Sequence, residues 1–198
     1  MALVRALEEE ELDPSLREKV GFFKGPLGVI PASVRTMARR PHIAEAFTAL
    51  NVAVMKDTGS VTPEFKRLLG YASSFASGCM YCQAHMILAS ERFGASEARL
   101  EGVFDFERSE AFTESEKAAL AYARAATEVP NAVTDAVADR LRAHWDEDAI
   151  VEITAVVALF GFLNRWNDSM GSALEDLPRS RAEGLLAEAT GWAIGKHG

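Results

Sequence analysis

Two cysteines and a histidine, each three residues apart, are the residues of this sequence whose types and spacing best suit catalytic chemistry. Cys79 and Cys82 are the two cysteines of the chain, and His85 follows them. On a helix a three-residue step turns by about 60°, so the three side chains would share about a third of the circumference. Two sulfurs at this spacing near a helix start can form a disulfide with little backbone movement.

The start of a helix would also activate these thiols. Free N–H groups and the helix dipole stabilise a thiolate and lower the pKa of a nearby cysteine. His85 lies one turn after Cys82 and can take or return a proton. A nucleophile, a resolving thiol and a base therefore occur within one short segment, and this pattern favours a redox dithiol.

Two other interpretations of the motif stay open. Structural zinc takes four ligands, whereas this motif offers three, and the remaining histidines His42, His144 and His197 are isolated in sequence. The motif could also be two ordinary buried cysteines beside a surface histidine, since buried cysteines are common. A thioredoxin-like site would need a strand before the motif, and the surrounding sequence is helical in pattern.

Helical signals dominate the chain, and no segment has the alternation of apolar and polar residues that is typical of a strand. The expected caps include Asp13 before Pro14, Thr62 before Pro63, and a capping box from Thr113 to Glu116. We expect an all-α fold with helices at about 14–23, 33–40, 41–56, 62–76, 78–93, 96–102, 113–127, 134–145, 146–175 and 178–194. Glycines and prolines make 24–31 an expected loop.

An internal repeat is one further possibility. Residues 67–85 align without gaps on 152–170, which places Tyr81 on Trp166 and the two cysteines on Asn164 and Asn167. The alignment would relate a redox core at about 61–94 to a second helical hairpin at about 146–175. Chance similarity between amphipathic helices explains it equally well. In either case we expect a single domain over 1–198.

Composition bounds the class of protein. The chain has 198 residues, of which 48% are apolar and 25% charged, and its net charge is −8, which argues against nucleic-acid binding. The N-terminal MALVRALEEEELD lacks the apolar core of a secretory signal. The longest nearly apolar run, Ala149–Leu163, is shorter than the ~18 to 20 residues of a membrane span. We therefore expect a cytoplasmic protein without membrane or nucleic-acid partners.

The cysteine segment also resembles a known family. Residues 68–85, LLGYASSFASGCMYCQAH, are similar to the core of the AhpD-like, carboxymuconolactone decarboxylase-like superfamily. Residues 28–31, 37–41 and 162–168 resemble its longer "peroxidase-related" members, so the resemblance covers most of 14–175. It implies an all-helical fold and a homo-oligomer, often a trimer or hexamer.

The resemblance further implies a thiol-dependent hydroperoxide reductase. Cys82 would attack a hydroperoxide and become a sulfenic acid, and Cys79 would resolve it to a disulfide. An external dithiol or thiol would then reduce the pair, starting at Cys79 as the more accessible sulfur. His85 would accept the thiol proton or protonate the departing alkoxide. No flavin, haem or nucleotide motif is visible, so we expect no cofactor and no metal.

The sequence departs from the family's peroxidase pattern in two places, Arg67 and Tyr81. The family usually has a glutamate twelve residues before the first cysteine, where this chain has Arg67. Glu64, one turn earlier, could substitute or be a first-turn acid favoured by the helix dipole, and Arg67 could stabilise the thiolate or be a solvated surface residue. Tyr81, where AhpD has a histidine, could line the pocket, donate a hydrogen bond or pack. Two residues separate Cys82 from His85, as in many members, whereas AhpD itself has three.

Two alternative functions come from other classes. One is a carboxymuconolactone decarboxylase-like enzyme, which would not depend on a cysteine pair. The other is a non-catalytic redox sensor, in which the disulfide changes a surface. One fold hosts several chemistries, so the fold alone does not decide between them.

We predict that the protein is a homo-oligomer with closed symmetry, because of the family resemblance and because the apolar content is high for an all-helical chain. Light scattering at micromolar concentration should give a mass that is a multiple of the chain mass. A monomer under these conditions would contradict the prediction.

Overall fold

The protein is described by a computed structural model that covers residues 2–198. All regular elements within these residues are helices, and no strand occurs among them, which confirms the predicted all-α class. The helices are α1 (Pro14–Val20), α2 (Lys24–Leu27), α3 (Ala32–Met37), α4 (Pro41–Met55), α5 (Pro63–Ser77), α6 (Met80–Arg92), α7 (Glu97–Gly102), α8 (Glu114–Thr127), α9 (Asp135–Arg142), α10 (Glu147–Met170) and α11 (Asp176–Thr190).

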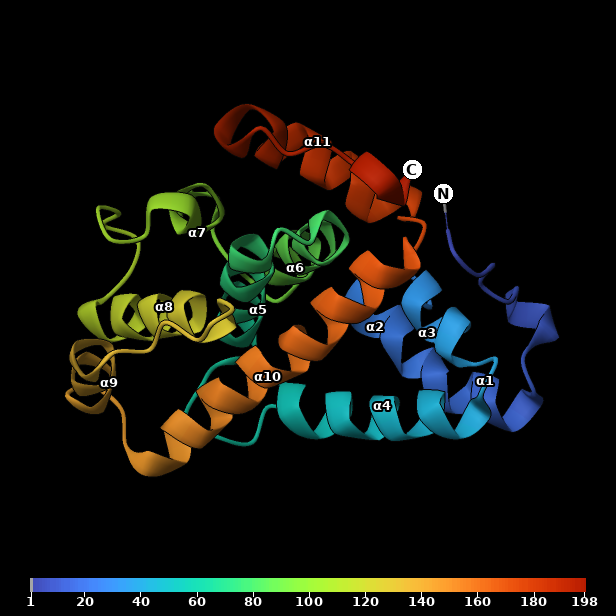
Figure 1. Cartoon of the computed structure of the whole chain (residues 1–198), viewed down its shortest axis with the longest axis horizontal. Coiled ribbons are helices and arrows are strands. Elements are labelled where there is room, and N and C mark those ends of the chain that lie inside the picture. The colour runs from blue at the N-terminus through green and yellow to red at the C-terminus, as the bar shows by residue number, and fades with distance from the viewer. Residues whose placement is uncertain (1) are drawn as a thin grey trace.

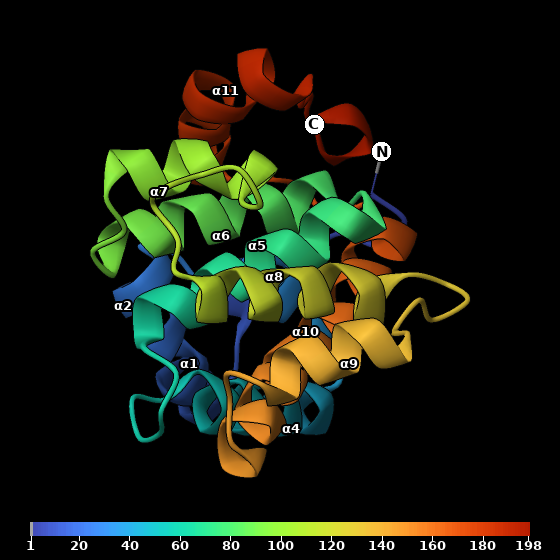
Figure 2. The same cartoon turned by 90° about the vertical axis from the view of Figure 1, so that its left-hand side faces the viewer.

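The hairpin of α5 and α6 forms the centre of the molecule (Figure 1). The long helix α10 crosses this hairpin and also packs on α4 and α8. The N-terminal helices α1 to α4 lie on one side, and α11 covers α6 from the other (Figures 1 and 2). The cysteine motif begins α6, so it lies where the central hairpin meets its covering layers.

Local sequence explains most of the helix ends. Gly78 ends α5 in the left-handed conformation (φ 73°), which glycine adopts without strain and which turns the chain into α6. Thr62 caps α5 by accepting a hydrogen bond from Phe65 N, and the capping box between Thr113 and Glu116 is present. These ends agree with the predicted ones to within a few residues.

Two predicted boundaries were wrong. The helix expected to reach residue 175 ends at Met170, because Gly171 turns the backbone into the left-handed region (φ 58°). The loop expected at 24–31 contains the helical turn α2. The early end of α10 leaves Glu175 as the N-cap residue of α11, a position that matters for the site described below.

The internal repeat is not confirmed. Residues 67–85 form a helix, a turn at Gly78 and a second helix, whereas residues 152–170 belong to the uninterrupted helix α10. The two segments therefore differ in fold where they align in sequence.

The helix α10 is also longer than its apolar run suggested. Its 24 residues make it the one described helix that is long and apolar enough to cross a membrane by length and composition, so shortness no longer excludes a span. Core helices commonly pass the same test, and α10 packs against α4, α5, α6, α8 and α9. Its packing is that of a core helix in the bundle.

A close contact sets the distance between α5 and α10. A methyl group added at Gly70 of α5 would lie 2.5 Å from the ring of Phe160 on α10, which is closer than real Cβ contacts occur. Phe160 is itself buried and lines the pocket beside Cys82. Glycine at position 70 therefore lets the two helices approach closely beside the cysteine motif.

Substitution of this glycine should destabilise the protein. Gly70→Ala should lower the free energy of unfolding in urea by about 1 to 3 kcal/mol, because overpacking against Phe160 outweighs the better helix propensity of alanine. The matched control is Gly184→Ala in α11, where nothing lies within 4 Å of the added methyl. It should raise stability by up to about 1 kcal/mol. Equal effects at both positions would contradict the packing argument.

Candidate active site

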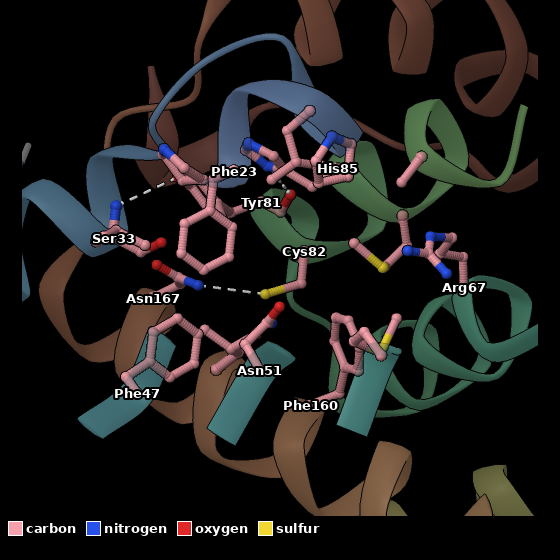
Figure 3. A pocket seen from close by; sticks show the side chains of 18 of the residues that line it. Phe23, Ser33, Phe47, Asn51, Arg67, Tyr81, Cys82, His85, Phe160 and Asn167 are labelled. Carbon is pink, nitrogen blue, oxygen red and sulfur yellow. Dashed lines mark hydrogen bonds between the residues drawn. The ribbon is translucent and has the colours of Figure 1, made fainter. Parts of the chain in front are cut away.

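An apolar pocket lies between the N-terminal helices, α5, α6 and α10 (Figure 3). It is a narrow cavity of about 60 Å³. Most of its wall is apolar, with Phe23, Leu27, Phe47, Met86, Phe160 and Leu163 among its members. Its polar members are Ser33, Asn51, Arg67, Tyr81, Cys82, His85 and Asn167. The pocket thus combines an apolar interior with one thiol and a few polar groups, as ligand sites commonly do.

The two thiols have different surroundings. Cys82 lines the pocket, whereas Cys79 is the N-cap residue of α6 and lies outside the pocket wall. Both are free and buried, with exposed fractions of 0% for Cys79 and 3% for Cys82. The prediction that Cys79 is the more accessible sulfur was therefore wrong, because α11 and the segment after it cover the start of α6.

Burial dominates the electrostatics of Cys82. Loss of solvent raises the pKa of the Cys82 thiol well above its ordinary value, and the adjacent Cys79 thiol adds to the rise. Asn167 on α10 acts in the opposite direction, since its Nδ2 donates a hydrogen bond to Cys82 Sγ at 3.3 Å (Figure 3). Cys82 therefore keeps its proton near neutral pH, contrary to the lowered pKa expected from the helix start.

His85 belongs to a network with Tyr81 and Glu175. Its Nε2 lies 3.0 Å from Glu175 Oε2, and its Nδ1 lies 3.0 Å from the carbonyl oxygen of Tyr81. The Tyr81 hydroxyl donates to Glu175 Oε1 at 3.3 Å, and the Tyr81 and His85 rings are 4.4 Å apart. Both nitrogens of His85 thus face oxygen atoms, while the Cys82 sulfur bonds to Asn167. His85 and Cys82 share the pocket without bonding to each other.

Glu175 is a site residue that the sequence did not reveal. Burial favours its neutral form, but His85 and the backbone N–H of Ala32 outweigh this effect and hold the pKa of Glu175 below its ordinary value. It is therefore an anion that can stabilise a proton on His85. It lies 90 residues after His85 in sequence, and no local pattern marked it.

Arg67 lines the same pocket, so its interpretation as a solvated surface residue was wrong. Burial lowers the pKa of Arg67 to about 10. Its guanidinium lies 3.4 Å from the centre of the Phe93 ring and donates to the carbonyl of Pro63. Glu64 does not take the place of the family glutamate, because it lies outside the pocket wall and pairs with Arg99 at 2.9 Å. We assign Glu64 no role in the site.

A second cluster surrounds Cys79. Its sulfur, a carboxylate oxygen of Asp168 and a ring nitrogen of His197 lie within 4.8 Å of one another. His197 was isolated in sequence, but the turn Gly195–His197 packs against α6 and brings it there. Trp192 ties the same segment to the helix, because its Nε1 donates to the carbonyl of Met80 at 3.1 Å.

Cysteine, aspartate and histidine can all bind metals, but hydrogen bonds occupy the histidine of this cluster. The Nδ1 of His197 lies 2.8 Å from the carbonyl of Ser172, and its Nε2 lies 3.2 Å from Asp168 Oδ1. Both imidazole nitrogens thus lie at hydrogen-bond distance from oxygen atoms, so hydrogen bonds with Ser172 and Asp168 account for the position of the ring without a metal ion. We therefore assign the cluster no metal and treat it as a hydrogen-bonded group.

The fold and the site together define a class: an all-helical protein with a buried Cys-x-x-Cys pair at the start of a central helix, one thiol of which faces an apolar pocket. The carboxymuconolactone decarboxylase family matches residues 41–125, which contain this motif. The chain belongs to the AhpD-like, carboxymuconolactone decarboxylase superfamily.

Several solved structures are similar over nearly the whole chain. The debrominase Bmp8 is 34% identical and covers 92% of this chain and 97% of its own, with a TM-score of 0.85. A cysteine-to-alanine variant of Bmp8 in complex with 2,3,4-tribromopyrrole is 31% identical and covers 93% and 98%, with a TM-score of 0.88. A peroxidase-related protein from Ralstonia eutropha JMP134 is 23% identical, covers 89% and 94%, and has a TM-score of 0.77, which shows the fold alone.

One curated relative covers most of the chain as well. The uncharacterized protein YnjA of Escherichia coli strain K12 is 28% identical over 165 residues, which are 83% of this chain and 90% of YnjA. This similarity extends well beyond the cysteine motif.

The contact between Asn167 and Cys82 can be tested directly. In a Cys79→Ser background, Asn167→Asp should slow alkylation of Cys82 by iodoacetamide near neutral pH by about tenfold or more. The substitution replaces a donor by a negative charge, so the thiolate loses stabilisation and the alkylation profile moves to higher pH. Asn131→Asp, in an exposed loop, is the matched control for an added charge. An unchanged rate in Asn167→Asp would contradict the assigned contact.

Proposed function

We propose that this protein is a thiol-dependent reductase of hydroperoxides in which Cys82 is the attacking sulfur. The observation that carries the proposal is that Cys82, with a partner thiol three residues earlier, lines an apolar pocket. Such a pocket suits an organic hydroperoxide, because its apolar body can occupy the wall while the peroxide group meets the thiol. Membership of the superfamily supports the same assignment.

The reaction would proceed in three steps. Cys82 loses its proton to solvent and attacks the terminal peroxide oxygen, and the O–O bond breaks. The departing alkoxide takes a proton from His85, so the products are a Cys82 sulfenic acid and an alcohol, and solvent returns a proton to His85. Cys79 then attacks the Cys82 sulfur, which forms the disulfide and releases water. An external dithiol reduces the disulfide by exchange, and a reducing compartment such as the cytoplasm would supply it. The two thiols provide both electrons, so the scheme uses no cofactor.

His85 has a defined place in this scheme. Its ring lines the pocket, and Glu175 can hold a proton on its Nε2. Of the two roles that the sequence left open for His85, this geometry supports protonation of the departing alkoxide. Tyr81 supports the arrangement through the contact of its ring with the His85 ring and through the hydrogen bond from its hydroxyl to Glu175.

A second candidate function is reductive removal of bromine from an aromatic ring. The similarity to Bmp8 and the phenylalanine-lined wall of the pocket favour it. The same thiols would suffice: Cys82 takes the bromine as a sulfenyl bromide, the ring carbon takes a proton, and Cys79 displaces bromide to form the disulfide. The brominated arene is reduced and the dithiol is oxidised, so the electrons balance.

Single turnovers should separate the roles of the residues. Each pre-reduced variant is mixed with one equivalent of cumene hydroperoxide or 2,3,4-tribromopyrrole, and peroxide loss or bromide release is measured. Cys82→Ser should abolish consumption, because it removes the attacking sulfur. Cys79→Ser should allow one oxidation that leaves a trappable Cys82 sulfenic acid but stops turnover. His85→Ala should slow the first step by roughly 10²-fold.

The exposed His144 supplies a matched control, because His144→Ala should react as the unmodified protein does. Full first-turnover activity in Cys82→Ser, with loss in Cys79→Ser, would reverse the two cysteine roles. If neither cysteine matters with either substrate, both candidate functions are wrong.

A further inference from the structure

Cys79 must both lose and regain a proton, yet it has no contact with solvent. Its sulfur is fully buried, and His85 on the pocket side is engaged with Tyr81 and Glu175. A thiol becomes a nucleophile only after it loses its proton. A group inside the protein must therefore accept the proton of Cys79 before it attacks Cys82.

His197 is the titratable imidazole beside this sulfur. A nitrogen of its ring and a carboxylate oxygen of Asp168 lie within 4.8 Å of the Cys79 sulfur, and His197 is 1% exposed. Asp168 holds the ring through Nε2 at 3.2 Å, and the carbonyl of Ser172 holds Nδ1 at 2.8 Å. Two oxygen acceptors at the ring nitrogens allow the ring to carry a second proton, as a proton acceptor requires.

We propose that His197 is the proton acceptor and donor of Cys79, and that Asp168 positions it. The cluster of Cys79, Asp168 and His197 would then serve the resolving thiol, while His85 and Glu175 serve the substrate. The inference rests on the proposed function in one respect, namely that Cys82 is the sulfur that reacts first.

The relay acts in two steps. During resolution the Cys79 proton moves to His197, the Cys79 thiolate attacks the Cys82 sulfur, the S–O bond breaks, and hydroxide takes a proton from solvent and leaves as water. During reduction an external thiolate attacks Cys82 through the pocket and the disulfide bond breaks. Cys79 departs as a thiolate and takes its proton back from His197. The reductant therefore enters at Cys82, and not at Cys79 as the sequence had suggested.

Several other groups face His197 and bear on its pH dependence. Asp168 on α10 lies 3.2 Å from Nε2, and Lys196 lies 3.6 Å from the same carboxylate. The Tyr81 ring on α6 is centred 5.7 Å from the His197 ring. Cys82 lies beside Cys79. A pH profile of the resolving step reports the cluster as a whole, so single substitutions are needed to assign it.

The test isolates the resolving step without a hydroperoxide. The reduced protein is treated with one equivalent of methyl methanethiosulfonate, which leaves a methyl disulfide on Cys82 and releases methanesulfinate. Cys79 then displaces methanethiol and forms the Cys79–Cys82 disulfide. Mass spectrometry follows both steps over a range of pH. The unsubstituted protein is compared with the variants His197→Gln, Asp168→Asn and His144→Gln.

His197→Gln should slow the displacement of methanethiol by tenfold or more and leave the first step unchanged, since removal of a general base typically costs 10²- to 10⁴-fold. The rate of the unsubstituted protein should level off as the pH rises, whereas the rate of His197→Gln should keep rising, because hydroxide must then remove the Cys79 proton. His144→Gln, a substitution of an exposed histidine, should match the unsubstituted protein.

The proposal would be overturned if His197→Gln had the same resolving rate and pH profile as the unsubstituted protein. It would also be overturned if methyl methanethiosulfonate reacted first with Cys79. If His197→Gln does not fold, the resolving rates of Asp168→Asn and of the unsubstituted protein, measured against pH, test the proposal instead. The relay is supported if Asp168→Asn slows the resolving step less than His197→Gln is expected to and shifts its pH profile. It is refuted if the resolving rate of the unsubstituted protein does not level off as the pH rises. The resolving step could depend on His197 although the protein consumes neither hydroperoxide nor bromopyrrole. That result would support the inference about His197 and refute the proposed function.

Discussion

The packing of α10 across the α5–α6 hairpin is the contact on which the site depends. Gly70 lets Phe160 approach α5 closely, and α10 also packs against α6. Two consecutive residues of α10 then serve different thiols. Asn167 bonds to Cys82 on the pocket side, and Asp168 bonds to His197 beside Cys79. Successive residues of a helix point about 100° apart, so one helix can supply both partners.

This arrangement gives two chemically similar sulfurs unequal surroundings. Cys82 faces an apolar pocket, where loss of solvent raises its thiol pKa and one amide donor opposes the rise. Cys79 occupies the N-cap of α6 and lies beside an imidazole that a carboxylate holds. The two thiols therefore differ because different helices cover each sulfur. Their three-residue spacing alone would not distinguish an attacking thiol from a resolving thiol.

The parts of the structure that local sequence controls were predictable. The all-α class followed from apolar periodicity, and caps such as Thr62 and Thr113 marked helix starts. The start of a helix at the cysteine motif was found in the same way. The failures share a different cause. Gly171 ends α10 early, and a single glycine within a helical pattern does not tell by itself whether the helix stops or continues.

The missed site residues depend on contacts between distant segments. Glu175 lies 90 residues from His85, and His197 more than 100 residues from Cys79, so no spacing rule connected them. The opposite error occurred at Glu64, which lies on the expected face of α5 but meets Arg99 of α7 first. Periodicity predicts which face of a helix a residue occupies, whereas the partner on that face is decided by packing.

The indole of Trp192 is bonded to the carbonyl of Met80, the residue that directly follows Cys79. Disulfides quench the emission of nearby tryptophans, and a bond between the cysteines would form next to this indole. The intrinsic emission of Trp192 should therefore be weaker when Cys79 and Cys82 form a disulfide than when both are free thiols.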